Sequence, residues 1–124
     1  GLGATIEDIK KIKDFKTIEK TTFSALATPE FKEEFNKTKN KNIILFGIET
    51  HICVNQTVNT LIELGYDVSV VSDASSSRSK DEHEAGLGRI KEHGAHILTT
   101  ETILFEWLRT SKHPKFKEIQ ALIK

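Results

Sequence analysis

The chain contains no methionine and few of several other residue types. Its 124 residues include one cysteine, two prolines, one tryptophan and one tyrosine. A single cysteine excludes an internal disulfide framework and is typical of a protein from a reducing compartment. Natural translation products normally begin with methionine, so its absence predicts a processed product, a trimmed form or a fragment.

Charge and hydropathy exclude further classes of protein. Lysine plus arginine and aspartate plus glutamate number 18 each, so no net charge favours nucleic acid or a membrane surface as a partner. No apolar run is long enough to span a bilayer, and no signal peptide is visible. We therefore expect a cytoplasmic protein, with the mitochondrion or another intracellular compartment as alternatives, and a partner that is neither nucleic acid nor membrane.

Apolar strands alternate with helices along the chain, which predicts an α/β fold with a parallel sheet and helices on both faces. The expected strands are 15–20, 43–48, 67–72 and 95–99, and residues 74–78 are expected to form a loop. The run 43–48 is apolar without alternation, which is typical of a strand covered on both faces. With no repeat or linker, residues 1–124 are expected to form a single domain.

Capping residues predict where the helices begin and end. Thr28 before Pro29 is a helix start, and Ser79 with Glu82 makes a capping box. Gly94 is expected to end that helix and Thr100 to cap the next.

Cys53 lies where strand 43–48 turns into a helix. A thiol at a helix N-terminus is close to unpaired N–H groups and to the positive end of the helix dipole, which favour the thiolate. The same N–H groups could bind the oxyanion that forms when a thiolate attacks a carbonyl carbon. From the residues alone, Cys53 is either a nucleophile or a small buried apolar side chain.

Two further reactive residues lie at the carboxyl ends of expected strands, where ligands of parallel sheets bind. Lys20 could stabilise a thiolate, or it could be one of many solvated lysines. Asp73 could serve its own loop or orient Arg78, and a structural role is favoured. The serine run before Arg78 could hold an anion or form a solvated loop.

The histidines give weaker signals. His51 could line a pocket or cap a turn, and His93 and His96 lack a third ligand for a metal site. We therefore expect surface histidines at the latter two positions, and likewise at His83 and His113. No metal and no cofactor are expected.

Several segments together resemble the isochorismatase-like cysteine hydrolases. The segment 47–54, Gly-Ile-Glu-Thr-His-Ile-Cys-Val, is similar to the cysteine motif of that family, and segments 19–24, 73–79 and 98–101 resemble other parts of it. The closing segment 113–119 looks most like the animal-type isochorismatase domain-containing proteins. The resemblance runs essentially from residue 1 to residue 124.

The resemblance implies a Rossmann-like sheet with an Asp–Lys–Cys triad. It identifies Cys53 as the nucleophile and Lys20 as the triad lysine. It also implies a cis peptide between Ile48 and Glu49, with the amides of Glu49 and Cys53 aimed at the oxyanion. Phe23 and His51 are the candidates for the substrate pocket.

The sequence also departs from the family pattern. The triad aspartate of the family lies on the first strand, in an apolar segment ending in Asp-Xaa-Gln, and no such segment is present. Asp8 and Asp14 lie in lysine-rich contexts that do not match it. We expect a domain that lacks its first strands and is N-terminally incomplete, and a homo-oligomer.

The leading functional hypothesis is hydrolysis of a small-molecule amide or related C–N bond by Cys53. The alternative is a catalytically incomplete member or fragment that acts through self-association or partner binding. Redox sensing through Cys53 ranks third, because no second cysteine is present to resolve an oxidised thiol.

Overall fold

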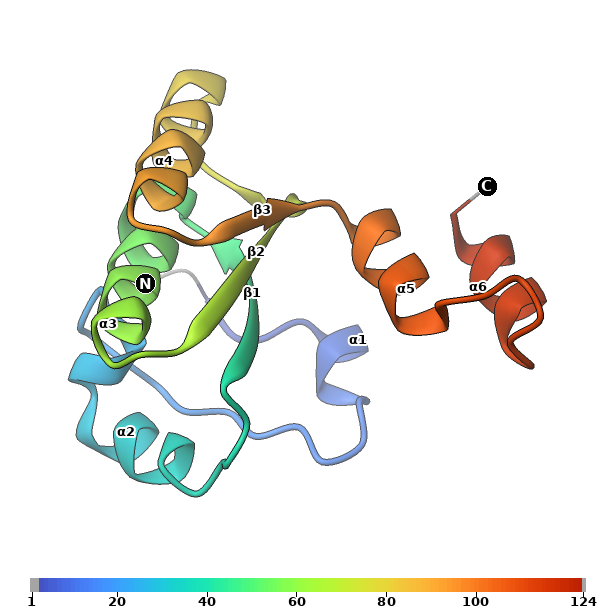
Figure 1. Ribbon diagram of the computed structural model, residues 1–124. Helices are drawn as coiled ribbons and strands as arrows, with labels where there is room; N and C mark the ends of the chain where they lie inside the picture. The colour runs from blue at the N-terminus through green and yellow to red at the C-terminus, as the bar shows by residue number, and fades with distance from the viewer. Residues whose placement is uncertain (1–2, 124) are drawn as a thin grey trace.

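Three strands form one parallel sheet, in the order β1-β2-β3, in the computed structural model (Figure 1). They are β1 (Asn42–Ile48), β2 (Asp67–Ser76) and β3 (His96–Leu98). The prediction of an α/β fold with adjacent parallel strands is therefore confirmed. The structure describes residues 3–123, so Gly1, Leu2 and Lys124, which the single-domain prediction includes, lie outside the described residues.

Helices lie on both sides of the sheet, with α3 and α4 along one side and α5 and α6 on the other (Figure 1). The helical elements are α1 (Glu7–Lys10), the 3₁₀ turn η1 (Ala25–Ala27), α2 (Pro29–Phe35), the π-helical turn η2 (Thr50–Val54), α3 (Asn55–Glu63), α4 (Lys80–Glu92), α5 (Thr100–Leu108) and α6 (Phe116–Leu122). Within residues 3–123, every helix is too short or too polar to cross a membrane.

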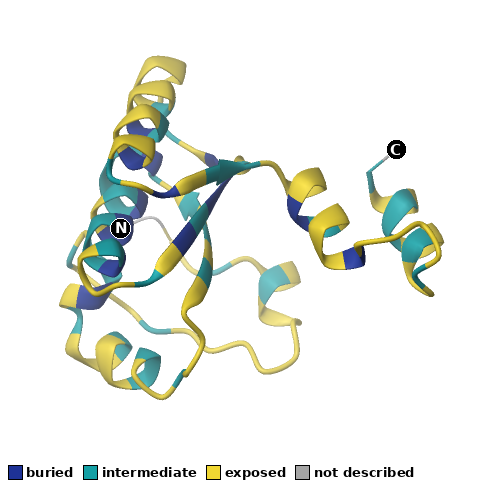
Figure 2. Ribbon diagram, in the orientation of Figure 1, coloured by how far each residue is buried: buried dark blue, intermediate teal, exposed yellow. Residues whose placement is uncertain are grey.

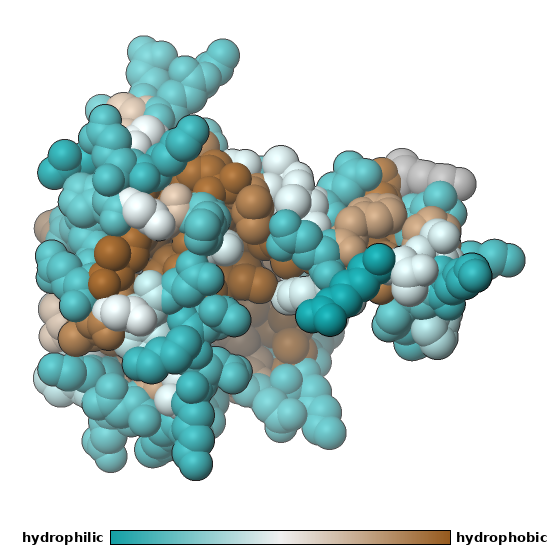
Figure 3. Space-filling model, in the orientation of Figure 1, coloured by the Kyte–Doolittle hydropathy of each residue, from teal (hydrophilic) through white to brown (hydrophobic). Residues whose placement is uncertain are grey.

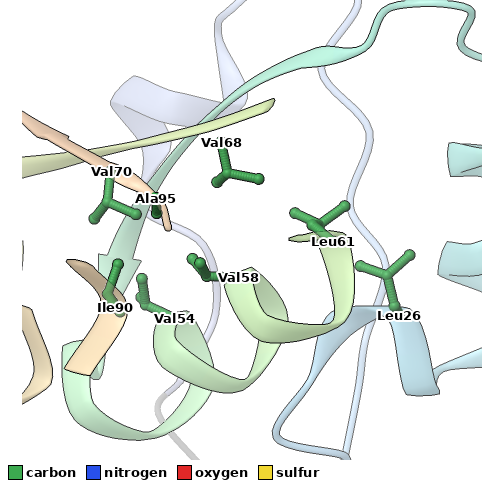
Figure 4. Packing of buried hydrophobic residues seen from close by; sticks show 8 residues of the cluster. All are labelled: Leu26, Val54, Val58, Leu61, Val68, Val70, Ile90 and Ala95. Atoms are coloured by element: carbon green, nitrogen blue, oxygen red, sulfur yellow. The ribbon is translucent and has the colours of Figure 1, made fainter. Parts of the chain in front are cut away.

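The hydrophobic core lies between the sheet and the layer of α3 and α4 (Figure 4). Val68 and Val70 point from β2 into this core, while the intervening position 69 faces away, as the two-residue period of a strand requires. Burying each large aliphatic side chain contributes about 1.5–3 kcal/mol. The buried residues concentrate where the sheet meets the layer of α3 and α4 (Figure 2). The cluster consists of Leu26, Val54, Val58, Leu61, Val68, Val70, Ile90 and Ala95.

Within the part of the chain that the structure describes, strand β1 is covered on one face only, so the prediction that both of its faces are covered is wrong. Ile43 and Leu45 pack against the core, whereas Ile44, Phe46 and Ile48 are exposed. The apolar run is present as predicted, but within residues 3–123 β1 is an edge strand and no element covers its second face. Apolar side chains form part of the visible surface between the α3–α4 layer and the α5–α6 arm (Figure 3).

The predicted ends of α4 are confirmed. The Ser79 hydroxyl accepts a hydrogen bond from the Glu82 N–H, and Gly94 follows the helix with a φ of 100°. The cap of α5 is Thr99, not Thr100 as predicted, because the Thr99 hydroxyl accepts from a backbone N–H of the first turn.

Two segments differ from the sequence prediction. Residues 15–20 form no strand, because no neighbouring strand pairs with them; within this segment Lys16 instead pairs with Glu34 of α2. Residues 74–76, predicted as loop, belong to β2, where Ser75 and Ser76 pair with Gly47 and Ile48. Pairing with β1 therefore extends β2 beyond its apolar part.

Candidate functional site

Cys53 lies in η2, the turn that joins β1 to α3. The peptide bond between Ile48 and Glu49 at the end of β1 is cis, as the resemblance implies. The Glu49 carbonyl then accepts hydrogen bonds from the N–H groups of Ile52, at 3.1 Å, and Val54, at 3.2 Å. Two residues of the turn are buried and the Cys53 thiol is half-buried, so the turn holds the thiol at the rim of the core.

Lys20 lies next to this thiol although 33 residues separate the two in sequence. Its Nζ is 3.6 Å from the Cys53 Sγ, and it donates to the carbonyl oxygens of Thr22, at 2.8 Å, and Phe23, at 3.2 Å. Two carbonyl acceptors and a sulfur around one Nζ are an environment for an ammonium, which donates three hydrogen bonds and accepts none. Lys20 is therefore placed as a positive charge beside the sulfur.

The segment that carries Lys20 is tied to α3. The Ala25 N–H donates to the Thr57 hydroxyl at 3.0 Å, and the Ser24 and Thr60 hydroxyls lie 3.1 Å apart. Because α3 continues directly from η2, the same helix positions both members of the Lys20–Cys53 pair.

A cavity of about 190 Å³ adjoins Cys53 and Lys20. Apart from Lys20, Cys53 and Thr57, its lining side chains are apolar. Both faces of β1 contribute to this lining, through Leu45 on the core side and Phe46 on the exposed side, so the cavity runs along the edge of the strand. The full lining is Lys20, Ala25, Leu26, Phe31, Phe35, Ile43, Leu45, Phe46, Ile48, Cys53, Val54, Thr57 and Leu61.

Three other hollows are larger. Two, of about 350 and 390 Å³, lie between residues 15–18 and α2, and a third, of about 270 Å³, is lined by residues 19–22, Thr28 and Pro29. None of the three contains a cysteine or a histidine. The cavity at the β1 edge, where an apolar wall meets a thiol and an ammonium, is therefore the better candidate for a binding site.

The loop after β2 and the start of α4 contact η2 and the residue before it through three side-chain pairs. Arg78 donates to both carboxylate oxygens of Glu49, with its Nε 3.2 Å and its Nη2 2.7 Å away, and its backbone N–H donates to the same carboxylate at 3.0 Å. The hydrogen bonds from Arg78 lower the pKa of the Glu49 carboxyl. The other two pairs join His51 to Ser77 and Thr50 to His83, each at 2.9 Å.

No pattern in the sequence indicates the pairing of Arg78 with Glu49. Asp73 is the candidate partner of Arg78 by sequence, but the Asp73 carboxylate accepts from the backbone N–H of Thr100, at 2.8 Å, and from its hydroxyl, at 3.0 Å. These bonds, the one from the N–H above all, lower the pKa of Asp73. Asp73 thus has a structural role at the start of α5, as favoured, but with a different partner.

The two candidates for the substrate pocket do not line the cavity beside Cys53. Phe23 is 57% exposed and approaches Lys20 only through its carbonyl, and His51 turns its ring toward Ser77 and Glu82. Their assignment to a pocket stays a prediction.

The remaining histidines are dispersed. His93 bonds to the carbonyl of Arg89, and His96 pairs with Asp67 at 3.0 Å. Among residues 3–123, no group of three histidine, cysteine, aspartate or glutamate side chains is arranged to hold a metal ion.

Comparison with known proteins places this geometry in a family. The sequence profile of the isochorismatase domain matches residues 3–102. Isochorismatase domain-containing protein 2 of Xenopus laevis is 44% identical to 99% of the chain, which spans 60% of that protein. The MAR1 ribonuclease of Caenorhabditis elegans is 41% identical, with a TM-score of 0.73 over 84% of this chain and 53% of the other.

A third similar protein is the nicotinamidase of Bacillus subtilis. It is 26% identical, with a TM-score of 0.65 over 75% of this chain and 51% of the other. The chain thus spans about half to three fifths of these relatives. The match of the domain profile to 100 of the 124 residues shows that the chain belongs to the isochorismatase family.

Proposed function

We propose that Cys53 is the nucleophile of a hydrolase that cleaves a small amide or related C–N bond. The observation that carries this proposal is the 3.6 Å separation of the Lys20 Nζ and the Cys53 Sγ beside an apolar cavity. An adjacent ammonium favours the thiolate, which is the nucleophilic form of cysteine. The nicotinamidase named above is a relative whose name denotes action on an amide.

In the proposed reaction the Cys53 thiolate forms a bond to the carbonyl carbon of the substrate. The carbonyl oxygen becomes an oxyanion, for which the amides of Glu49 and Cys53 are the proposed donors. Collapse of this intermediate breaks the C–N bond, and the nitrogen leaves with a proton as an amine or ammonia. Water then attacks the resulting thioester, releases the carboxylic acid and regenerates the thiol.

This sequence of steps needs a base, and Lys20 does not fit that role while its ammonium donates to two carbonyls. Among residues 3–123, Lys20 is the one side chain hydrogen-bonded to the Cys53 sulfur. We propose that a carboxylate from a segment outside the 124 residues supplies the base. The edge of β1 that does not pair with β2 within residues 3–123 offers backbone groups for such a segment beside Cys53.

The first experiment measures ammonia release from nicotinamide and a panel of small amides. The protein is compared with Cys53→Ala and Cys53→Ser, in the 124-residue chain and in a form extended by any upstream residues of its gene. We expect Cys53→Ala to lose roughly 1,000-fold or more in rate, and mass spectrometry to find an acyl group on Cys53. Equal rates for the wild type and both variants would refute the proposal.

The second candidate function is association without catalysis, which the exposed side chains of β1 favour, since an uncovered apolar strand promotes pairing. It predicts a homo-oligomer whose assembly is unaffected by Cys53→Ala, and no amide hydrolysis in either form.

RNA belongs in the panel of substrates with the small amides because the C. elegans relative is named a ribonuclease. The balanced charge of this chain favours the amide, because phosphate-backbone binding depends on net positive charge.

A further inference from the structure

Arg78 and Glu49 form a pair that the proposed reaction does not use. Arg78 lies in the loop between β2 and α4, and Glu49 is the residue at the junction of β1 and η2. Three donor groups of Arg78 converge on one carboxylate, two from the guanidinium and one from the backbone N–H. This bidentate arrangement fixes orientation as well as charge.

Among the ion pairs of residues 3–123, this pair contains the least exposed carboxylate. The Glu49 side chain is 18% exposed, whereas that of Arg78 is 69% exposed, so Arg78 approaches a partly buried carboxylate from the solvent side. The Arg89–Glu92 pair on α4 is exposed on both sides, at 62% and 74%, with 3.8 Å between its charged atoms. An exposed pair of that kind contributes little, whereas a partly buried carboxylate depends more on its partner.

Glu49 also organises the turn that carries the thiol. Its side chain is held by Arg78, while its carbonyl accepts the hydrogen bonds from Ile52 and Val54 that begin and close η2. Cys53 lies between these two donors in sequence. A change in the orientation of Glu49 therefore changes the orientation of the turn and of the thiol.

We propose that Arg78 is a positioning residue that acts through Glu49 to hold η2, and with it the Cys53 sulfur, in place beside Lys20. The inference rests on the proposed role of Cys53 as a nucleophile. Arg78 makes no step of the reaction itself. Its role is to keep the sulfur within the 3.6 Å of the Lys20 Nζ that the structure shows.

The test compares Arg78→Gln, Arg78→Lys, Glu49→Gln and the double variant Arg78→Gln/Glu49→Gln, with Arg89→Gln as the matched control on an exposed pair. For the amide that the wild type hydrolyses best, we expect Arg78→Gln to lower kcat roughly 10- to 100-fold with KM nearly unchanged, because misplacement of a reacting group costs rate. Arg78→Lys should not rescue kcat, since an ammonium lacks the planar fork of the guanidinium. The double variant should be no slower than the slower single variant.

Three results would overturn the proposal. The first is a kcat for Arg78→Gln equal to that of Arg89→Gln. The second is a rise in the KM of Arg78→Gln at constant kcat, which would mean that Arg78 contacts the substrate. The third is a loss of kcat in the double variant equal to the product of the losses in the two single variants.

Alkylation of Cys53 by iodoacetamide at pH 7 gives a readout that is independent of any substrate. Arg78→Gln should slow it and Arg89→Gln should leave it unchanged. If the wild type hydrolyses no amide but Arg78→Gln still slows alkylation, the proposed function fails and the positioning role stands. If amides are hydrolysed and neither variant changes kcat or alkylation, the positioning role fails alone.

Discussion

Gly86 offers a sharp test of how α4 meets the turn that carries Cys53. Gly86 is buried in the middle of α4, where a Cβ would lie 2.8 Å from both the Cα and the backbone N of His51. Real Cβ atoms essentially never approach other atoms that closely, and the atoms concerned belong to backbone that cannot rotate away. Gly86→Ala must therefore move either α4 or η2.

Gly88 on the same helix is the matched control. A Cβ there meets no atom within 4 Å. Replacing a helical glycine with alanine without strain stabilises by about 0.5–1 kcal/mol, because alanine has less conformational entropy to lose. Both variants share this gain, so the difference between them isolates the steric effect.

Overpacking of a close contact costs about 1–3 kcal/mol. We therefore expect Gly88→Ala to raise the free energy of unfolding by about 0.5–1 kcal/mol. Gly86→Ala should have a free energy of unfolding about 1–3 kcal/mol lower than that of Gly88→Ala. For a domain of this size, this corresponds to melting temperatures about 4–12 °C apart.

Urea denaturation followed by circular dichroism measures this difference, and equal slopes in the wild type and the variants justify the two-state comparison. Iodoacetamide alkylation of Cys53 reports whether η2 has moved. Equal free energies of unfolding for Gly86→Ala and Gly88→Ala would refute the argument that α4 touches the backbone of η2.

Three further predictions follow from individual contacts. Asp73→Asn should destabilise the protein at neutral pH, and its deficit relative to the wild type should shrink on acidification. The bonds from Thr100 lower the pKa of Asp73 in the folded state, so its stabilisation is present above the unfolded pKa of about 3.9 and is lost as pH falls through the lower folded pKa. Thermal melts between pH 7 and pH 2 test this, and a constant deficit would contradict it. Lys20→Gln should slow alkylation of Cys53 by iodoacetamide at pH 7, because it removes the ammonium 3.6 Å from the sulfur. Lys112→Gln, at an exposed lysine, is the control, and equal alkylation rates for the two variants would show that the Lys20 ammonium does not act on the thiol. Phe46→Ser should weaken self-association, because the Phe46 side chain is 59% exposed on the uncovered face of β1. If the wild type is an oligomer and the variant has the same sedimentation profile, the interface lies elsewhere.

Much of the fold could be predicted because its signals are local. Ser79 and Glu82 lie three residues apart and meet in the first turn of one helix, and Gly94 needs only its own φ to end that helix. The parallel sheet follows from apolar strands that alternate with such helices. The position of Cys53 within a turn after β1 follows from the same local pattern.

Other predictions failed or were missing where the deciding partner is distant in sequence. Residues 15–20 have the composition of a strand, but none of the strands among the described residues pairs with them. Asp73 could accept hydrogen bonds from its own loop, yet the folded chain brings Thr100 to it instead. Gly86 lies inside a predicted helix, where a glycine costs stability, and this cost is the signal that the sequence offers. The reason for the glycine is the backbone of His51, 35 residues away, which leaves no room for a Cβ.

By itself the sequence determined the order of β1, β2, β3 and the helices that follow them, the ends of α4 and the position of the thiol after β1. Each of these depends on backbone preferences and hydrogen bonds within a few residues. Only the tertiary structure decided that Lys20 lies 3.6 Å from Cys53, that Arg78 holds Glu49, and that one face of β1 is left uncovered by the other residues between 3 and 123. Contacts and burial between distant segments depend on how the elements pack, and no local pattern encodes that geometry.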